Sequence, residues 1–224
     1  MTITECYLRA LQKAEENISN GGIKLDEARF VQLFNDEQDR LVRHIIDKKN
    51  EDEIRYLQAL LVNSEPSSSI RDYDNPKSTL FALPSNMFAF SNVAGVFKQG
   101  ECEVTDFTLW EAKNENIHEL FADIFNKPDF DFRETFYTIG EDGLRVYLDD
   151  FTCTAVYITY YRYPKKVDIA GYTKADGTAS TTIDPELDDK LVEQILNMVE
   201  KQHALNESEY TRYSLDANNV VSPI

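Results

Sequence analysis

The first third of the chain carries apolar residues at the spacing of α-helices. Ile3, Tyr7, Leu11, Ala14 and Ile18 lie three or four residues apart, so they share one helical face. An Asn-Gly-Gly sequence follows directly and is typical of the end of a helix. We therefore predict a first helix that ends before these glycines.

Two further helices are expected before residue 62. Asp26 is a suitable N-cap, and the apolar stripe that follows it is interrupted by Glu37 and Gln38. The stripe consists of Phe30, Leu33, Phe34, Leu41 and Ile45. Asn50, with Glu53 three residues later, resembles a capping box and predicts a third helix.

Between residues 63 and 78 the chain has five serines, two prolines and no apolar period, which predicts a linker or a mobile loop. Beyond this segment the apolar period becomes two, as in β-strands. Strands are expected near 79–83, 87–97, 101–110, 133–138, 144–148 and 152–163. A parity change near Thr105 predicts a bulge. A short helix is expected at 117–125 and a tight turn at 140–143, which reads Gly-Glu-Asp-Gly.

The last predicted strand ends in the sequence YITYYRYPKKV. Alternate strand residues share a face, so Val156, Ile158 and Tyr160 form the more apolar side and are expected in the core. Tyr157, Thr159, Tyr161 and Tyr163 form the opposite face. Tyrosine offers a large contact area that tolerates water, so we interpret this face as a protein contact in preference to solvated surface.

A second helical region follows near the C-terminus. The sequence Asp184-Pro185-Glu186 combines an N-cap, a first-turn proline and an early carboxylate. The apolar stripe after it is wide and includes Leu191 and Ile195, so this helix is expected to pack between other helices. Residues 206–224 lose the helical period and read as an extended arm.

Together these patterns predict an α+β protein, in which N- and C-terminal helices pack together as a helical bundle and an antiparallel β-domain is inserted between them. The expected divisions are N-terminal helices over 1–62, the loop 63–78, a β-rich domain over 79–172, a loop and C-terminal helix over 173–205 and the arm 206–224.

The charge of the chain narrows the classes of partner. Lys and Arg number 23 against 40 Asp and Glu, a net charge of −17, and residues 101–150 alone hold 14 acidic and 4 basic side chains. Such a surface opposes binding to phosphate backbones and to anionic lipids. The three cysteines are far apart and no secretory leader or long apolar run is found, so synthesis and assembly in a cytoplasm are expected.

No pattern in the sequence indicates catalysis. Phosphate-binding loops, nucleophile elbows and metalloprotease motifs are missing, and the three histidines lie on different predicted helices. The pairs Asp129/Asp131 and Asp149/Asp150 are spaced for metal or acid–base work, but 40 acidic residues produce such pairs by composition alone. We expect no enzyme activity, no cofactor and no metal site.

Five segments follow one another along the chain: FNDEQDRLVRHIIDKKNEDEIRYLQALL, LPSNMF, IHELFADIFNKPDF, YITYYRYPKKVDI and IDPELDDKLVEQILNMVEKQ. Their order resembles the ring or head-to-tail connector proteins of short-tailed bacteriophages, most of all those of crAss-like phages. The resemblance spans roughly residues 1–200. The serine-rich segment 63–78 and the acidic segment 101–150 depart from it.

What the resemblance implies is a structural protein of the virion neck or tail. Such proteins form closed rings, commonly twelvefold, that join the portal to the tail and surround the DNA exit channel, through which DNA passes without specific binding. The implied partners are further copies of the chain, the portal protein and neighbouring tail proteins, with assembly in the host cytoplasm.

Ring formation needs two complementary faces on each subunit. The sequence candidates for subunit or ring contacts are Tyr157, Tyr161, Arg162, Tyr163, Leu191, Ile195, Val220, Val221 and Ile224. The alternative hypothesis is an acidic cytosolic protein that sequesters a basic partner. It predicts a monomer or dimer with acids at phosphate-like spacing, whereas the acids here are spread through several predicted elements.

Overall fold

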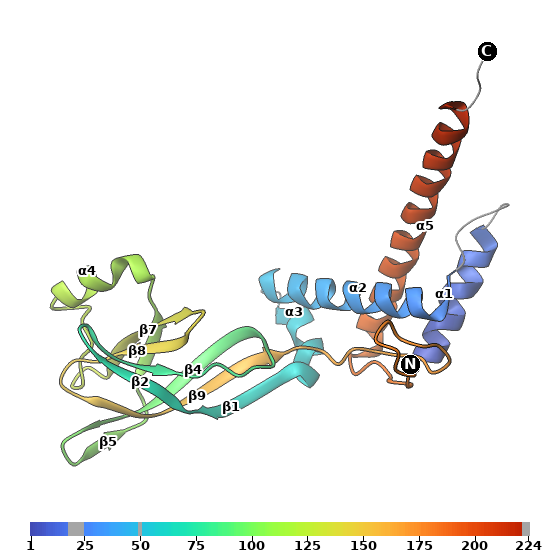
Figure 1. Ribbon diagram of the computed structural model, residues 1–224. Coiled ribbons are helices and arrows are strands. Elements are labelled where there is room, and N and C mark those ends of the chain that lie inside the picture. The colour runs from blue at the N-terminus through green and yellow to red at the C-terminus, as the bar shows by residue number, and fades with distance from the viewer. Residues whose placement is uncertain (18–24, 49–50, 221–224) are drawn as a thin grey trace. The chain divides into compact units, whose positions relative to one another are not determined.

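A computed structural model of the protein describes residues 1–17, 25–48 and 51–220 (Figure 1). The chain divides into two compact units, the first made of Met1–Ala59 with Pro164–Ile224 and the second of Leu60–Tyr163. The helices of the first unit are α1 (Ile3–Asn17), α2 (Glu27–Lys48), α3 (Glu51–Ile54), most of η1 (Arg55–Leu60) and α5 (Asp189–Val220). The second unit contains the strands.

The second unit is built from two sheets. The first has the order β1 (Leu61–Ser67), β9 (Thr152–Arg162), β4 (Met87–Gln99) and β5 (Cys102–Val104), and all neighbours are antiparallel. The second has the order β2 (Ser69–Asp74), β3 (Lys77–Phe81), β8 (Gly143–Tyr147), β7 (Glu134–Gly140) and β6 (Thr108–Glu111), in which β6 and β7 are parallel. The short helices η2 (Asn114–Asn116) and α4 (Ile117–Ala122) connect β6 to β7.

One core lies between the two sheets and a smaller one lies under α4. Val156, Ile158 and Tyr160 of β9 belong to the first core, which confirms the predicted core face of this strand. The alternation along β7 sends Tyr137 into this core and Phe136 into the second, which also contains Ile117 of α4. The unit is therefore layered as sheet, sheet and short helix.

The α+β class predicted from the sequence is confirmed, but the terminal helical bundle is wrong. In the first unit α1 and α2 both contact α5, and α2 crosses α5 instead of running alongside it (Figure 1). Non-helical residues complete the core, because Val167, Ile169 and Leu187 are buried there. The Asn35 side chain pairs with the backbone of Val167 in both directions, at 2.9 and 3.1 Å. An extended segment thus covers surface on α2 that a bundle would cover with a helix.

The inserted β-domain also differs from the expected antiparallel one, since β6 and β7 are parallel. The predicted bulge near Thr105 is a crossing between sheets, because β5 pairs with β4 whereas β6 pairs with β7. The parity of the apolar residues changes there because they serve different sheets. Phe107, between the two strands, stacks on Phe97 with ring centroids 4.2 Å apart.

The segment 63–78, expected to be a loop, forms most of β1 and β2 and the start of β3. Both β1 and β2 are edge strands, and an edge tolerates Pro66 because one side of the strand needs no ladder donor. Every residue of β2 except Tyr73 is exposed, so it has no apolar period to detect. Main-chain pairing with β3 holds it in place.

The helix ends show which capping predictions hold. Asp26 caps α2 as predicted, its Oδ1 accepting the Arg29 amide at 2.8 Å. The C-terminal helix begins later than expected, because Asp188 Oδ1 accepts the Lys190 amide at 2.9 Å. Asp184, predicted to cap that helix, instead accepts the amide of Ile3 at 2.9 Å, at the start of α1.

The expected arm over 206–224 is also different, because α5 continues to Val220. A helix can extend without an apolar stripe once packing holds its first turns. The unfavourable free energy of nucleation has then already been met, and each added residue gains a backbone hydrogen bond. Residues 221–224, and with them the predicted contacts Val221 and Ile224, lie outside the described residues, as do Ile18 and the Asn-Gly-Gly sequence.

Candidate functional site

The loop between α4 and β7, residues 123–133, is the most apolar exposed segment that the structure describes; we call it the aromatic loop. Its side chains Ile124, Phe125 and Phe132 are 80%, 90% and 78% exposed. Large apolar side chains left this accessible are typical of protein contacts. The aromatic loop is therefore the first candidate for an interaction surface.

The first half of the aromatic loop is held by Asp123. Its Oδ1 accepts the Phe125 amide at 3.0 Å and its Oδ2 accepts the Asn126 side chain at 2.5 Å. These hydrogen bonds, that of Phe125 first, lower the pKa of Asp123 below its ordinary value. Lys127 forms an ion pair with Asp149 at 2.8 Å.

The second half is held by Asp129 and by an aromatic anchor. Asp129 Oδ1 accepts the amides of Asp131 and Phe132 at 2.8 and 3.0 Å. Phe130 points the other way, into the core, where it packs against Phe107 and Phe151. The exposed rings thus sit on a backbone that is already ordered, which lowers the entropic cost of binding.

A groove between α2 and α5 is the second candidate surface, and we call it the α2/α5 groove. It has a volume of about 720 Å³. Its lining residues are Glu37, Arg40, Leu41, His44, Lys48, Glu53, Gln194, Asn197, Met198, Lys201, Gln202 and Leu205. Leu205 is exposed at its end, whereas Leu41 is buried. The groove combines an apolar floor with several basic side chains.

Glu37 is a polar residue buried beside this groove. Its side chain is 8% exposed, and one carboxylate oxygen lies 3.5 Å from the Arg40 guanidinium. The other oxygen, Oε2, has no hydrogen-bond partner among the residues that the structure describes. Leaving a buried acceptor unpaired is costly, so this oxygen favours a further hydrogen-bond donor.

The tyrosine face predicted on β9 is only partly exposed. Tyr157 and Tyr163 are accessible, and the Tyr163 ring packs edge-on against Phe88 with centroids 4.9 Å apart. Tyr161 is buried, and its neighbours on the adjacent strands are Leu61 and Ala89. Burial raises the pKa of Tyr161 above its ordinary value.

The remaining predicted contact residues lie in other environments. Arg162 is half-buried and donates to the Tyr163 carbonyl at 3.2 Å. Leu191 and Ile195 are buried in the first unit, so they belong to the core of the single chain. Val220 is the last residue of α5. The structure therefore leaves Tyr157 and Tyr163 as the accessible members of the predicted set whose side chains it describes.

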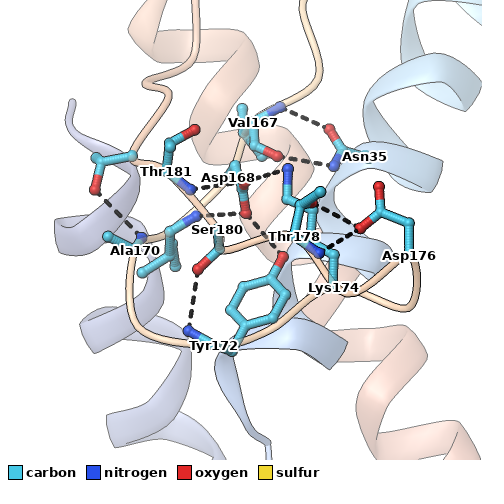
Figure 2. A network of polar contacts seen from close by, with 12 residues as sticks. Asn35, Val167, Asp168, Ala170, Tyr172, Lys174, Asp176, Thr178, Ser180 and Thr181 are labelled. Carbon is cyan, nitrogen blue, oxygen red and sulfur yellow. Dashed lines mark hydrogen bonds and ion pairs between the residues drawn. The ribbon is translucent and has the colours of Figure 1, made fainter.

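A polar network around Asp168 joins several side chains of the first unit (Figure 2). One carboxylate oxygen accepts the Tyr172 hydroxyl at 2.8 Å and the Ile169 amide at 2.9 Å. The other accepts the Thr181 amide at 3.2 Å and pairs with Lys174 at 2.8 Å. Burial would raise the pKa of Asp168, but these donors outweigh burial and hold the pKa below its ordinary value.

The rest of this network orders the same loop. Ser180 Oγ accepts the amides of Gly171 and Tyr172, both at 3.0 Å. Burial, followed by the hydrogen bond to Asp168, raises the pKa of Tyr172 to about 12. With both carboxylate oxygens engaged and its pKa lowered, Asp168 is suited to holding the loop and unsuited to removing a proton from a substrate.

Several of the other candidate side chains are engaged or buried, whereas Cys102 and Asp131 are exposed. Asp129 holds the aromatic loop and Asp149 pairs with Lys127, which accounts for one member of each acidic pair. Burial raises the pKa of Cys6 to about 11 and that of Cys153 to about 12. Over residues 1–17, 25–48 and 51–220, no group of three or more His, Cys, Asp or Glu side chains is placed to hold a metal ion.

Sequence reasoning weighed Asp129 and Asp131 as a metal pair and missed the exposed rings beside them. The available signal was the alternation of aspartate and phenylalanine in Pro-Asp-Phe-Asp-Phe, residues 128–132. Phe130 packs into the core and Phe132 is exposed to water. Asp129 accepts the two backbone amides that hold the turn.

None of the helices in the described ranges has the length and apolar character needed to cross a bilayer.

No protein-family model matches the chain, and a search of curated proteins finds no match.

Proposed function

We propose that the chain is a structural protein of a tailed-phage virion, which forms a homo-oligomeric ring in the neck or tail, joins the portal to the tail and surrounds the DNA exit channel. The observation that carries this proposal is the aromatic loop, in which an ordered backbone presents Ile124, Phe125 and Phe132 to water. A surface of this kind favours a protein partner. The type of assembly is proposed from the segment order, which resembles that of ring proteins of crAss-like phages.

The charge of the second unit supports a conduit for DNA. Its exposed acidic residues include Glu101, Glu103, Asp106, Glu111, Glu115, Glu119, Asp131, Glu141 and Asp142. An acidic surface repels phosphate, so DNA can move past it without being held. A channel protein needs this property, whereas a protein that packages or repairs DNA needs the opposite one.

The function is tested by measuring molecular mass in solution with light scattering and by imaging in negative stain. The protein is measured alone and then with the portal and tail proteins of the same phage. We expect rings, either from the chain alone or after these partners are added. A chain that stays monomeric in every mixture and binds a basic protein tightly would instead support the acidic sequestering protein and would overturn the proposal.

A further inference from the structure

We propose that the aromatic loop of one copy docks into the α2/α5 groove of a second copy, and that this contact repeats from subunit to subunit. The inference rests on the proposed ring function and identifies its subunit contact. Two different complementary surfaces on one chain define a head-to-tail contact, which closes into a ring when the rotation between neighbours permits it.

The two surfaces have matching apolar content. The loop presents exposed Phe125 and Phe132, and the groove presents Leu41, Met198 and Leu205 along its length. A volume of about 720 Å³ lies within the range of pockets that enclose small apolar ligands. Aromatic side chains inserted into such pockets commonly supply most of the binding energy of a protein interface.

The charges of the two surfaces differ in sign. The groove is lined by three basic side chains, Arg40, Lys48 and Lys201, and by two acidic ones, Glu37 and Glu53, so its lining carries a net charge of +1. The loop contributes three carboxylates, those of Asp123, Asp129 and Asp131. The basic residues of the loop do not offset these acids, because Lys127 pairs with Asp149 and Arg133 pairs with Asp106. Complementary charge of this kind orients an interface and disfavours other partners.

Glu37 gives a separate reason to expect an occupant. It is buried beside the groove, and its Oε2 atom has no partner among the residues described by the structure. Because this oxygen is itself buried, an amide from an incoming loop would supply the hydrogen bond only after the Glu37 side chain turns toward the groove. The second copy thus provides apolar side chains, negative charge and a donor to one groove.

The test uses two variants of the full chain. A loop variant carries Phe125→Ser and Phe132→Ser, and a groove variant carries Lys48→Glu and Lys201→Glu. All four side chains are exposed, so the fold is expected to remain. Each variant should weaken self-association by at least about thirtyfold, as the loss of an interface hot spot does. Mass in solution is measured under the conditions in which the unmodified protein assembles.

Mixing the two variants provides the decisive measurement. The loop variant keeps an intact groove and the groove variant keeps an intact loop, so the mixture should form a dimer of one copy of each and nothing larger. Matched controls are Ile70→Ser in the second unit and Leu8→Glu in the first, which also change exposed apolar side chains. Both controls should assemble normally.

The outcomes separate this inference from the function on which it rests. If the unmodified protein forms rings and both variants do so equally well, the docking contact is wrong and the ring function stands. If the loop variant forms rings but no longer binds portal or tail protein, the loop contacts another virion protein and the inference is likewise overturned. If the unmodified protein never assembles, the proposed function fails and the inference fails with it.

Discussion

Asp168 shows how one buried side chain orders a loop of the first unit through its hydrogen bonds. The segment after β9 has few apolar residues, and its order depends on hydrogen bonds to a buried carboxylate (Figure 2). The amide of Ile169, the hydroxyl of Tyr172 and the ammonium of Lys174 all point to it. Such charge-assisted hydrogen bonds are stronger than neutral ones.

Replacing Asp168 with Asn is expected to lower the free energy of unfolding at pH 7 by about 1.5–3 kcal/mol, because hydrogen bonds to a charged group are lost. The pKa of Asp168 is lower in the folded protein than in the unfolded chain. Its stabilising contribution is therefore present above the unfolded pKa, about 3.9, and is lost as the pH falls through the folded value.

Urea unfolding of the protein and the Asp168→Asn variant at pH 7 and near pH 3 measures this contribution. The gap between the two should narrow at the lower pH. Asp131→Asn, at an exposed position, serves as the control and should show a small effect at both pH values. A gap that stays constant with pH would mean that the charge of Asp168 does not stabilise the loop.

The hairpin of β7 and β8 shows how an element depends on one backbone position. Gly140 and Gly143 pair across the predicted tight turn. Gly143 has a φ of +142°, and a Cβ atom there would lie 2.3 Å from the Phe81 carbonyl oxygen on β3. A Cβ at Gly140 would meet nothing within 4 Å. The two glycines therefore form a matched pair with different constraints.

Gly143→Ala is expected to destabilise the second unit by about 1–3 kcal/mol, because the backbone must shift away from β3 and adopt a conformation that side chains disfavour. Gly140→Ala should change the stability by less than about 0.5 kcal/mol, as is usual for an open surface position. Thermal unfolding of both variants measures the difference. Equal effects would show that the close approach to Phe81 does not limit this hairpin.

The second unit is inserted into the sequence of the first, since one continuous segment forms the second unit and the two segments that flank it form the first. The ends of the inserted segment lie together, because Leu61 pairs with Tyr161 where β1 meets β9. Each unit has its own buried residues. An insertion with adjacent ends and its own core is expected to fold alone.

We predict that Leu60–Tyr163, expressed alone, folds into a β-rich protein with a single cooperative unfolding transition. Circular dichroism and urea titration provide the measurement. As a control, Ile158→Ala, which removes a fully buried side chain of β9, should lower the stability of this fragment by about 2–5 kcal/mol. A fragment without a cooperative transition would mean that the inserted segment depends on the flanking helices.

Assembly is expected to depend on the aromatic loop more than on the β9 tyrosines. The sequence pointed to Tyr157, Tyr161 and Tyr163 as a contact face, but Tyr161 is buried and Tyr163 packs on Phe88. The rings left in water are those of Phe125 and Phe132. Local alternation shows which residues share a face, but it does not show which residues of that face other parts of the chain cover.

The sequence predicted the elements whose period is set by local geometry. The strands around β3, β4, β7, β8 and β9 lie close to their expected places. The core face of β9 and the Asp26 cap of α2 were also predicted correctly. In these elements the burial pattern follows directly from the helical or strand period, so neighbouring residues carry the information.

The tertiary structure decided which elements pair and which surfaces stay open. The segment 63–78 is extended because neighbouring strands pair with its backbone. β5 and β6 are separate strands because β5 pairs with β4 in one sheet and β6 pairs with β7 in the other. Asp184 caps α1 across 181 residues of sequence, an arrangement that no local pattern reports. These outcomes depend on hydrogen bonds and packing between distant residues, whose energies exceed the small differences in local propensity.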